Sequence, residues 1–161
     1  MAQNRIQKLF IDSYSGVNTK VWLLALVTFV NRAGAMVLPF LSLYFTSIEG
    51  YSLSTTGIIL LFYGIGSFVG NYWGGVLTDK VGAFRVQLLS LLFTSLAFFI
   101  LSILHTPVSM AVGLFISTIF MDIFRPANMS SVGVLVDKEH RTKAIGVIRL
   151  AINLGFAAGP A

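Results

Sequence analysis

Residues 56–85 read TGIILLFYGIGSFVGNYWGGVLTDKVGAFR, a long apolar run followed by a short polar turn. The run itself, residues 56–78, contains no charged side chain. About 20 helical residues are enough to cross the roughly 30 Å hydrocarbon core of a bilayer. We therefore predict a membrane-spanning helix over residues 56–78, with a turn at the membrane surface directly after it.

Four further stretches have the same apolar character, and each contains at most two charged residues. These stretches are residues 21–48, 86–104, 108–136 and 144–161. Strands of soluble proteins last about 4 to 8 residues, and strands of membrane barrels alternate in polarity over about 10 residues, so the lengths indicate helices. We predict an all-α membrane protein with five spans, of which the fifth is truncated because it is still continuing at the last residue.

The composition agrees with a membrane protein. Of the 161 residues, 56% are hydrophobic and 11% are charged, whereas about 25% of a soluble domain is charged. This argues against a soluble globular enzyme. There is no cysteine, which excludes disulfides and thiolate metal sites. We find no metal site, phosphate-binding loop, dinucleotide fingerprint or nucleophile motif, so we expect no enzyme activity and no cofactor.

The loop charges predict the orientation of the chain in the membrane. Eight basic residues lie before the first span or in the second and fourth loops, namely Arg5, Lys8, Lys20, Lys80, Arg85, Lys138, Arg141 and Lys143. The other two loops, residues 49–55 and 105–107, contain no Lys or Arg. Because basic loops stay on the cytoplasmic side, we predict a multi-pass protein of the bacterial inner (plasma) membrane with a cytoplasmic amino terminus. The net charge of +5 then reflects topology rather than nucleic-acid binding.

The segment before the first span, residues 1–20, is predicted to be cytoplasmic. Ile6, Phe10 and Tyr14 recur at helical spacing beside Arg5 and Lys8. This pattern is typical of a short helix that lies in the membrane interface, and a mobile tail is the alternative.

Glycines at intervals of four indicate where helices pack closely. Gly66, Gly70 and Gly74 lie on one face of the second span, and Gly155 and Gly159 repeat the spacing before Pro160 in the fifth. Small residues allow close approach of helix backbones in lipid. These faces provide either general helix packing or surfaces that move against one another during transport. Pro39 and Pro126 lie inside spans and predict kinks.

Three arginines inside the spans mark a candidate functional site. An arginine near the centre of a membrane helix costs roughly 2.5 to 3.5 kcal/mol on insertion, so its presence suggests a function. Arg32 and Arg125 each lie 11 residues from the cytoplasmic end of a span, which is about 16 Å inside the membrane. Arg149 is closer to the cytoplasmic surface and can extend toward it.

Asp122 and Arg125 are three residues apart and share a helix face. They can form an internal ion pair that makes the helix insertable. Alternatively, they belong to a site that contacts substrate or protons, because a carboxylate kept from water can exchange a proton. Asn31 and Asn153 are near in-span arginines. The predicted substrate and proton pathway is therefore Asn31, Arg32, Asp122, Arg125, Arg149 and Asn153.

The turn after the second span carries a recognisable motif. Its residues Gly75, Asp79, Lys80, Gly82 and Arg85 meet the pattern G-x-x-x-D-[RK]-x-G-x-x-[RK], which resembles the loop signature of the major facilitator superfamily. Residues 137–146 resemble the loop after the fourth helix of that family. The fifth span resembles the family's fifth helix and the start of its antiporter motif, through Arg149, Asn153, Gly155, Gly159 and Pro160.

The resemblance, which extends from about Val21 onward, implies a fold and a gate. The fold would have twelve helices in two halves built from inverted three-helix repeats, and this chain would be five helices of the first half. Asp79 would cap a helix of the second half, and a basic residue of the same loop would pair with Asp137 to lock the outward-open state. Ala83 replaces a basic residue found in many members, so Lys80 or Arg85 would make this pair. The gate residues are then Gly75, Asp79, Lys80, Gly82, Arg85, Asp137 and Arg141.

We therefore expect a secondary transporter that moves a small solute by alternating access, driven by protons, with efflux of drugs or metabolites favoured. A proton-coupled peptide symporter is the alternative, because residues 125–131 and 152–155 also resemble that branch. However, Asn31 precedes Arg32 where that branch has an acidic residue. A non-transporting membrane sensor or assembly module is the alternative of another class. The expected partners are the solute, protons, the lipid bilayer and the remaining helices of the transporter.

Overall fold

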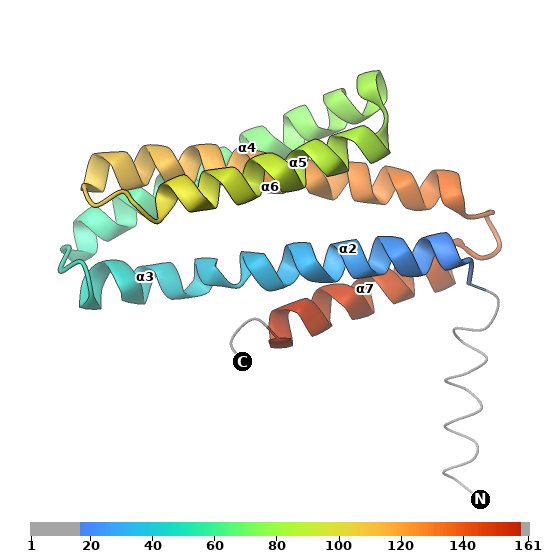
Figure 1. Cartoon of the computed structure of the whole chain (residues 1–161), viewed down its shortest axis with the longest axis horizontal. Coiled ribbons are helices and arrows are strands. Elements are labelled where there is room, and N and C mark those ends of the chain that lie inside the picture. The colour runs from blue at the N-terminus through green and yellow to red at the C-terminus, as the bar shows by residue number, and fades with distance from the viewer. Residues whose placement is uncertain (1–16, 159–161) are drawn as a thin grey trace, which may run out of the picture. The chain divides into compact units, whose positions relative to one another are not determined.

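The computed structural model describes residues 17–158, which form helices joined by short loops and contain no strand within that range (Figure 1). The helices are α2 (Thr19–Ala35), α3 (Val37–Ser47), α4 (Leu53–Val81), α5 (Ala83–Leu101), α6 (Pro107–Leu135) and α7 (Arg141–Ala158). The predicted interfacial helix in residues 1–20 lies almost wholly outside the described residues, and so do Gly159 and Pro160.

Four segments are long and apolar enough to cross a membrane: Thr19–Ser47, Leu53–Val81, Ala83–Leu101 and Pro107–Leu135. They correspond to the first four predicted spans. The fifth predicted span corresponds to α7. Its 18 described residues include Arg141, Lys143 and Arg149, which lower its apolar character below that of the other four.

The first predicted span is not one continuous helix. α2 ends at Ala35, and α3 begins at Val37 after a turn at Met36. Pro39 explains this break, because proline has no N–H to donate to the carbonyl group of Ala35, four residues earlier, and its ring crowds that carbonyl. The kink predicted from Pro39 is therefore a division of the span into two helices.

The chain divides into two compact units. Of the described residues, unit 1 comprises 17–34 and 132–158, and unit 2 comprises Ala35–Ser131. In unit 1, apolar residues of α2 and α7 form one core together with Val132 of α6. Its buried members are Val21, Leu24, Ala25, Val132, Ala144, Val147, Ile148 and Ala151.

Gly155 brings α7 close to α2 within unit 1. A Cβ atom at Gly155 would lie 2.7 Å from Cβ of Arg32 and 2.8 Å from the carbonyl oxygen of Phe29, so a side chain there would force the helices apart. The glycine thus places the backbone of α7 directly against the residue that carries the first in-span arginine.

Unit 2 contains α3, α4, α5 and most of α6, packed around two apolar clusters. One cluster joins α3 to the ends of α5 and α6 and includes the fully buried Phe45 and Leu114. The second cluster joins Val86 of α5 to Ile123 and Ala127 of α6. Many other large apolar side chains of these helices are exposed, as expected for surfaces that face lipid.

The glycine face of α4 packs against α6. A Cβ atom would lie 2.5 Å from the carbonyl oxygen of Phe115 at Gly66, and 2.5 Å from that of Ile119 at Gly70. At Gly74 it would lie 2.6 Å from Cγ of Pro126. Any side chain at these positions would collide with α6, so the glycines allow the two backbones to pack in contact.

Candidate functional site

Asp122 lies near the middle of α6 and its side chain points toward α4. It is 3% exposed, and its carboxylate accepts a hydrogen bond from the hydroxyl group of Ser67. One turn along α4, Asn71 donates its amide to the carbonyl oxygen of Ser67 at 2.9 Å. A buried carboxylate and its hydroxyl partner therefore lie at the tightly packed α4–α6 contact.

Arg125 does not neutralise Asp122. In the described part of the chain, no ion pair joins these two side chains, and Arg125 is exposed. The internal ion pair considered from the sequence is therefore absent from the structure. The reason is the rotation of α6 about its axis. Asp122 faces the glycine face of α4, whereas the side chain of Arg125, three residues later, is exposed.

In unit 1, the structure separates the four predicted pathway residues into two pairs. Asn31 is 7% exposed and Arg32 is partly buried, whereas Arg149 and Asn153 are exposed on α7. Among the described atoms, Oδ1 of Asn31 is buried and has no hydrogen-bond partner. Arg32 lies beside Gly155, so α2 presents a partly buried arginine at the α7 contact.

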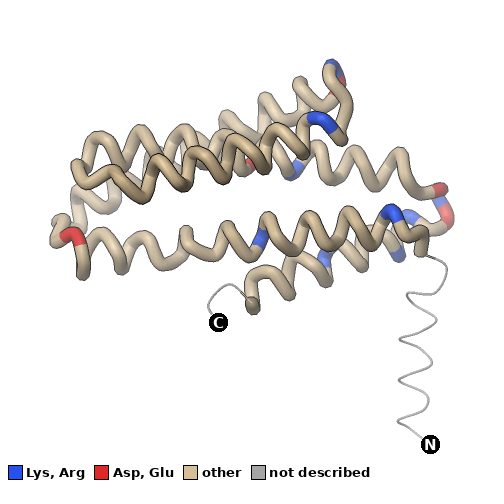
Figure 2. The backbone as a smooth tube through the Cα atoms, in the orientation of Figure 1, with Lys and Arg blue, Asp and Glu red and all other residues tan. Residues whose placement is uncertain are grey.

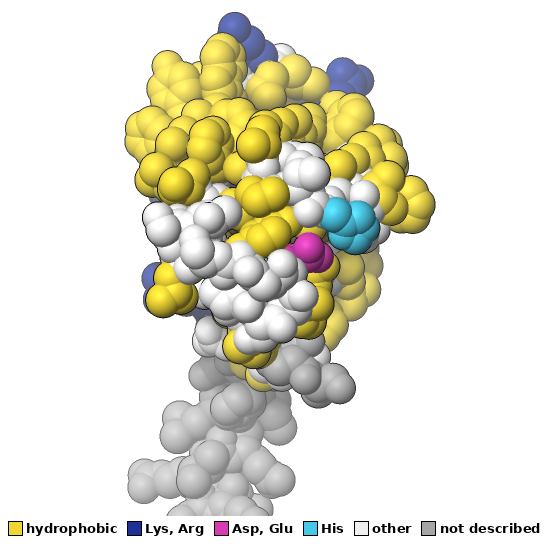
Figure 3. All heavy atoms as spheres, turned by 90° about the vertical axis from the view of Figure 1, so that its left-hand side faces the viewer, with side chains coloured by type: hydrophobic (Ala, Val, Ile, Leu, Met, Phe, Trp, Pro, Cys, Tyr) yellow, Lys and Arg dark blue, Asp and Glu magenta, His cyan; other side chains and the backbone are white. Residues whose placement is uncertain are grey.

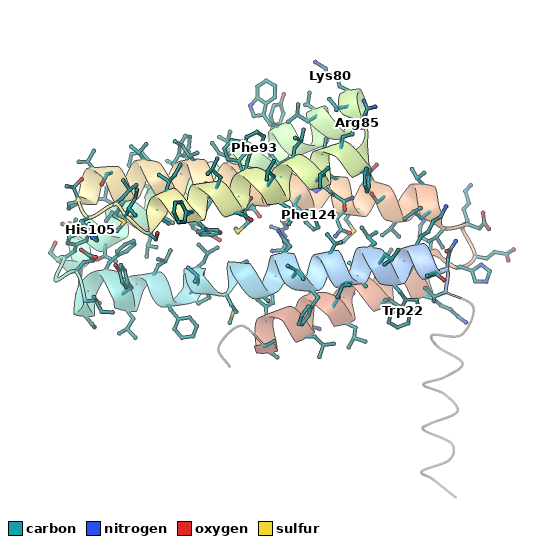
Figure 4. The ribbon with its side chains drawn as sticks, viewed as in Figure 1. Trp22, Lys80, Arg85, Phe93, His105 and Phe124 are labelled. Atoms are coloured by element: carbon teal, nitrogen blue, oxygen red, sulfur yellow. The ribbon has the colours of Figure 1, made fainter. Side chains whose placement is uncertain are left out.

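The turn between α4 and α5 depends on Gly82. This glycine has φ of +92°, a conformation that side-chain-bearing residues rarely adopt, and its N–H donates to the carbonyl oxygen of Thr78 at 3.0 Å. Lys80 and Arg85 extend from the turn (Figure 4). Together with Asp79, they are exposed.

The other three predicted gate residues, Gly75, Asp137 and Arg141, lie in α4, in the α6–α7 loop and at the start of α7. Within the described residues, no atom lies within 4 Å of a Cβ placed on Gly75, so this glycine does not serve a close helix contact here. Nη2 of Arg141 donates to the carbonyl oxygen of Gly133 at 3.3 Å, which satisfies a carbonyl near the end of α6. Asp137 is exposed in the loop between α6 and α7. Its pairing with Lys80 or Arg85 stays a prediction.

A polar cluster at the opposite end of unit 2 was not expected from the sequence. Tyr44 donates its hydroxyl to Oε1 of Glu49 at 2.7 Å, and Nδ1 of His105 lies 3.7 Å from the same oxygen. Tyr51 donates to the carbonyl oxygen of His105 at 2.6 Å. A view of this end shows a histidine beside an acidic side chain (Figure 3). One feature of the sequence indicated this cluster: Glu49 is the single acidic residue in the two loops that contain no Lys or Arg.

The cluster affects the ionisation of Tyr51. Partial burial and the nearby Glu49 carboxylate raise the pKa of Tyr51 above its ordinary value of 10.0. Tyr51 therefore stays neutral at physiological pH and remains a hydrogen-bond donor to the loop that contains His105. These contacts join the α3–α4 loop to the α5–α6 loop.

Comparison with known proteins agrees with the helical architecture and with the motif in the α4–α5 turn. A family model described as Major Facilitator Superfamily matches residues 21–161. The chain belongs to the major facilitator superfamily. The predictions of this family and of an all-α, multi-pass membrane protein are confirmed. Membership in a family of transporters also favours a transporter over an enzyme.

Three relatives are similar to this chain over most of its length. The uncharacterized MFS-type transporter YttB of Bacillus subtilis is 31% identical over 86% of this chain and 35% of its own length. A Na(+), Li(+), K(+)/H(+) antiporter of Planococcus maritimus is 23% identical over 82% of this chain and 32% of its own length. A multi-drug resistance efflux pump PmrA homolog of Lactococcus lactis is 22% identical over 95% of this chain and 38% of its own length. The chain spans about a third of the length of these relatives.

Proposed function

We propose that this protein is a secondary transporter that exports a small solute, a drug or a metabolite, in exchange for protons by alternating access. The observation that carries the proposal is the buried carboxylate of Asp122, which has a hydroxyl group rather than an arginine as its partner. An ionisable group inside a membrane span is costly, so its presence there favours a functional role.

The proposed chemistry is reversible protonation of Asp122. Binding of a proton removes the negative charge from the α4–α6 contact, and release of the proton restores it. The change in charge alters which conformation is favoured, because a neutral carboxyl group is much less costly than a carboxylate in an apolar setting. This links proton movement to the exchange of conformations.

The remaining predicted residues would bind solute and control access. Asn31 and Arg32 supply a buried amide and a guanidinium group, which suit a solute with hydrogen-bond acceptors or negative charge. Arg125, Arg149 and Asn153 are exposed and would contribute where the rest of a transporter meets them. Asp79, Lys80 and Arg85 at the α4–α5 turn would form the gate together with Asp137.

The charge distribution supports a cytoplasmic amino terminus in a bacterial plasma membrane. Lys and Arg gather at the α4–α5 turn and around the loop between α6 and α7 (Figure 2). The loop residues 49–52 and 102–106 contain no Lys or Arg. By the positive-inside rule, the basic ends face the cytoplasm.

The direction and the substrate class are open to a direct test. The protein encoded by the full reading frame that contains this chain is purified and placed in liposomes with an imposed pH gradient. Efflux and uptake are measured with a lipophilic cationic dye, with Na⁺ and K⁺, and with a dipeptide as separate arms. Proton-driven movement of the dye supports drug efflux. Movement of the dipeptide with the proton gradient, or no movement of any solute, contradicts the proposal.

Asp122→Asn tests the proton-binding group in the same assay. We expect the variant to retain the fold and to bind solute, while exchange driven by the pH gradient falls at least tenfold, because the amide cannot take up and release a proton at this position. Ser130→Ala, a change on the exposed face of α6 that alters no charge, is the control. Wild-type coupling in Asp122→Asn would rule out Asp122 as the proton carrier.

A further inference from the structure

Ser67 is the side chain of a neighbouring helix that binds the Asp122 carboxylate. Its Oγ donates to Oδ2 of Asp122 from α4, and the two residues are 55 positions apart in the sequence. Asp122 is 3% exposed, so within unit 2 the carboxylate depends on this hydroxyl group for hydrogen bonding in place of water.

The packing of α4 on α6 explains why Ser67 makes this contact. Gly66 and Gly70 bring the two backbones together, because a Cβ at either position would come within 2.5 Å of a carbonyl oxygen of α6. Ser67 lies between them, where its short side chain spans the remaining gap. Asn71 is one turn farther along the same helix, and its amide donates within α4 to the carbonyl oxygen of Ser67.

A hydroxyl group can both donate and accept a hydrogen bond, so Ser67 can serve as a partner of either charge state of a carboxyl group. We propose that Ser67 is the positioning residue of Asp122 and serves both of its charge states. It donates to the carboxylate, as in this structure, and accepts from the O–H of the carboxylic acid once a proton has bound. This inference rests on the proposed function of Asp122.

When Asp122 changes its charge state, the carboxyl hydrogen and the Ser67 hydroxyl hydrogen each still have an acceptor. When Asp122 donates, the Ser67 hydroxyl hydrogen turns to the carbonyl oxygen of Tyr63, one helical turn back, an acceptor that helix serines commonly use and that here it would share with Oγ1 of Thr118, which lies 3.3 Å away. Ser117 shows this arrangement on α6, since its Oγ donates to the carbonyl oxygen of Gly113 at 2.7 Å. Only the O–H bond of the carboxyl group forms or breaks.

The test uses Ser67→Ala in the purified full-length protein, with infrared difference spectra recorded on acidification. The carbonyl band of protonated Asp122 is identified by its disappearance in Asp122→Asn. We expect this band to move to higher wavenumber in Ser67→Ala, because the acid loses its acceptor. In liposomes, proton-driven exchange should fall about tenfold, since a hydrogen bond to a charged group contributes about 1.5 kcal/mol or more.

Two further variants separate positioning from packing. Ser67→Thr keeps the hydroxyl group and should restore the wild-type band and most of the exchange. Ser67→Cys keeps a side chain of the same shape with a somewhat larger atom and a weaker donor, and it should show an intermediate band even if Ser67→Ala does not fold. Ser90→Ala is the matched control, because Ser90 Oγ donates across helices to the carbonyl oxygen of Phe120 at 2.6 Å without touching Asp122.

The possible outcomes distinguish the two proposals. If Asp122→Asn abolishes proton coupling while Ser67→Ala and Ser67→Cys leave the carbonyl band and the exchange rate unchanged, the assignment of Ser67 is wrong and the proposed function stands. If Asp122→Asn keeps normal coupling, the proposed function itself fails. A shifted band in Ser67→Ala and Ser67→Cys, its return in Ser67→Thr and no change in Ser90→Ala support the assignment.

Discussion

Gly74 of α4 lies directly against the ring of Pro126 in α6. The position that a Cβ atom would take at Gly74 is 2.6 Å from Cγ of Pro126 and 2.8 Å from Cα of Ile123. Pro126 lacks the N–H that an internal helix residue normally donates, yet α6 continues through it from Pro107 to Leu135. The missing side chain at Gly74 therefore provides the space that the proline ring occupies on this face.

Gly74→Ala should destabilise the protein by about 1 to 3 kcal/mol, because the added methyl group overpacks the contact with Pro126 and Ile123. The measurement is the thermal midpoint of the purified protein in detergent. Gly75→Ala is the matched control, since a Cβ at Gly75 meets no described atom within 4 Å. Gly75→Ala should leave the thermal midpoint unchanged or raise it slightly. Equal effects of the two substitutions would contradict the packing explanation.

Gly155→Ala should weaken the contact of α7 with α2. Its new Cβ would lie 2.7 Å from Cβ of Arg32, so we expect a loss of about 1 to 3 kcal/mol in stability and a change in solute affinity through displacement of Arg32. Thermal unfolding and solute binding are both measured. Gly146→Ala on the same helix meets no described atom within 4 Å and should leave both values near the wild type.

The raised pKa of Tyr51 predicts that the folded protein loses stability at alkaline pH. Its pKa is raised above 10.0 in the folded protein, so the unfolded chain releases this proton at a lower pH than the folded one does. The contribution of Tyr51 to folding stability is therefore fully present below pH 10. It is lost as the pH rises through the pKa of Tyr51 in the folded protein. Thermal midpoints measured across this range should fall less in Tyr51→Phe than in the wild type.

Phenolate absorbance in the ultraviolet checks the same point directly. The phenolate absorbance that Tyr51→Phe removes should titrate with its midpoint above pH 10, whereas a midpoint at or below pH 10 would contradict the raised pKa. Tyr72→Phe, a change at an exposed tyrosine of α4, should leave the alkaline dependence of stability unchanged.

Asp79→Asn should reduce transport about tenfold without lowering the thermal midpoint. Asp79 is exposed at the end of α4, so its carboxylate does not support the packing of unit 2, while the proposed gate requires its charge. Initial rates of solute exchange in liposomes provide the measurement. Glu139→Gln, at an exposed position in the α6–α7 loop, should leave the rate unaltered. Full activity of Asp79→Asn would exclude the gate.

The glycines of α4 show how much of the fold was predictable. Their spacing of four indicated a close helix contact, and Gly66, Gly70 and Gly74 do lie against a neighbouring backbone. That the neighbour is α6 could not be read from the spacing, since the interval specifies a face and not its partner. Pro39 similarly predicted a kink, but the complete division between α2 and α3 depends on the local backbone.

The sequence by itself determined the family and the apolar stretches that form long helices, and it predicts the orientation, because apolar length, loop charge and the motif at residues 75–85 are properties of contiguous residues. Only the tertiary structure decided which groups meet. It placed Asp122 against Ser67 rather than Arg125, and it brought Glu49 and His105 together at one end of unit 2. The physical reason is that such contacts depend on how each helix is rotated and packed, and close packing brings together residues that lie more than 50 positions apart.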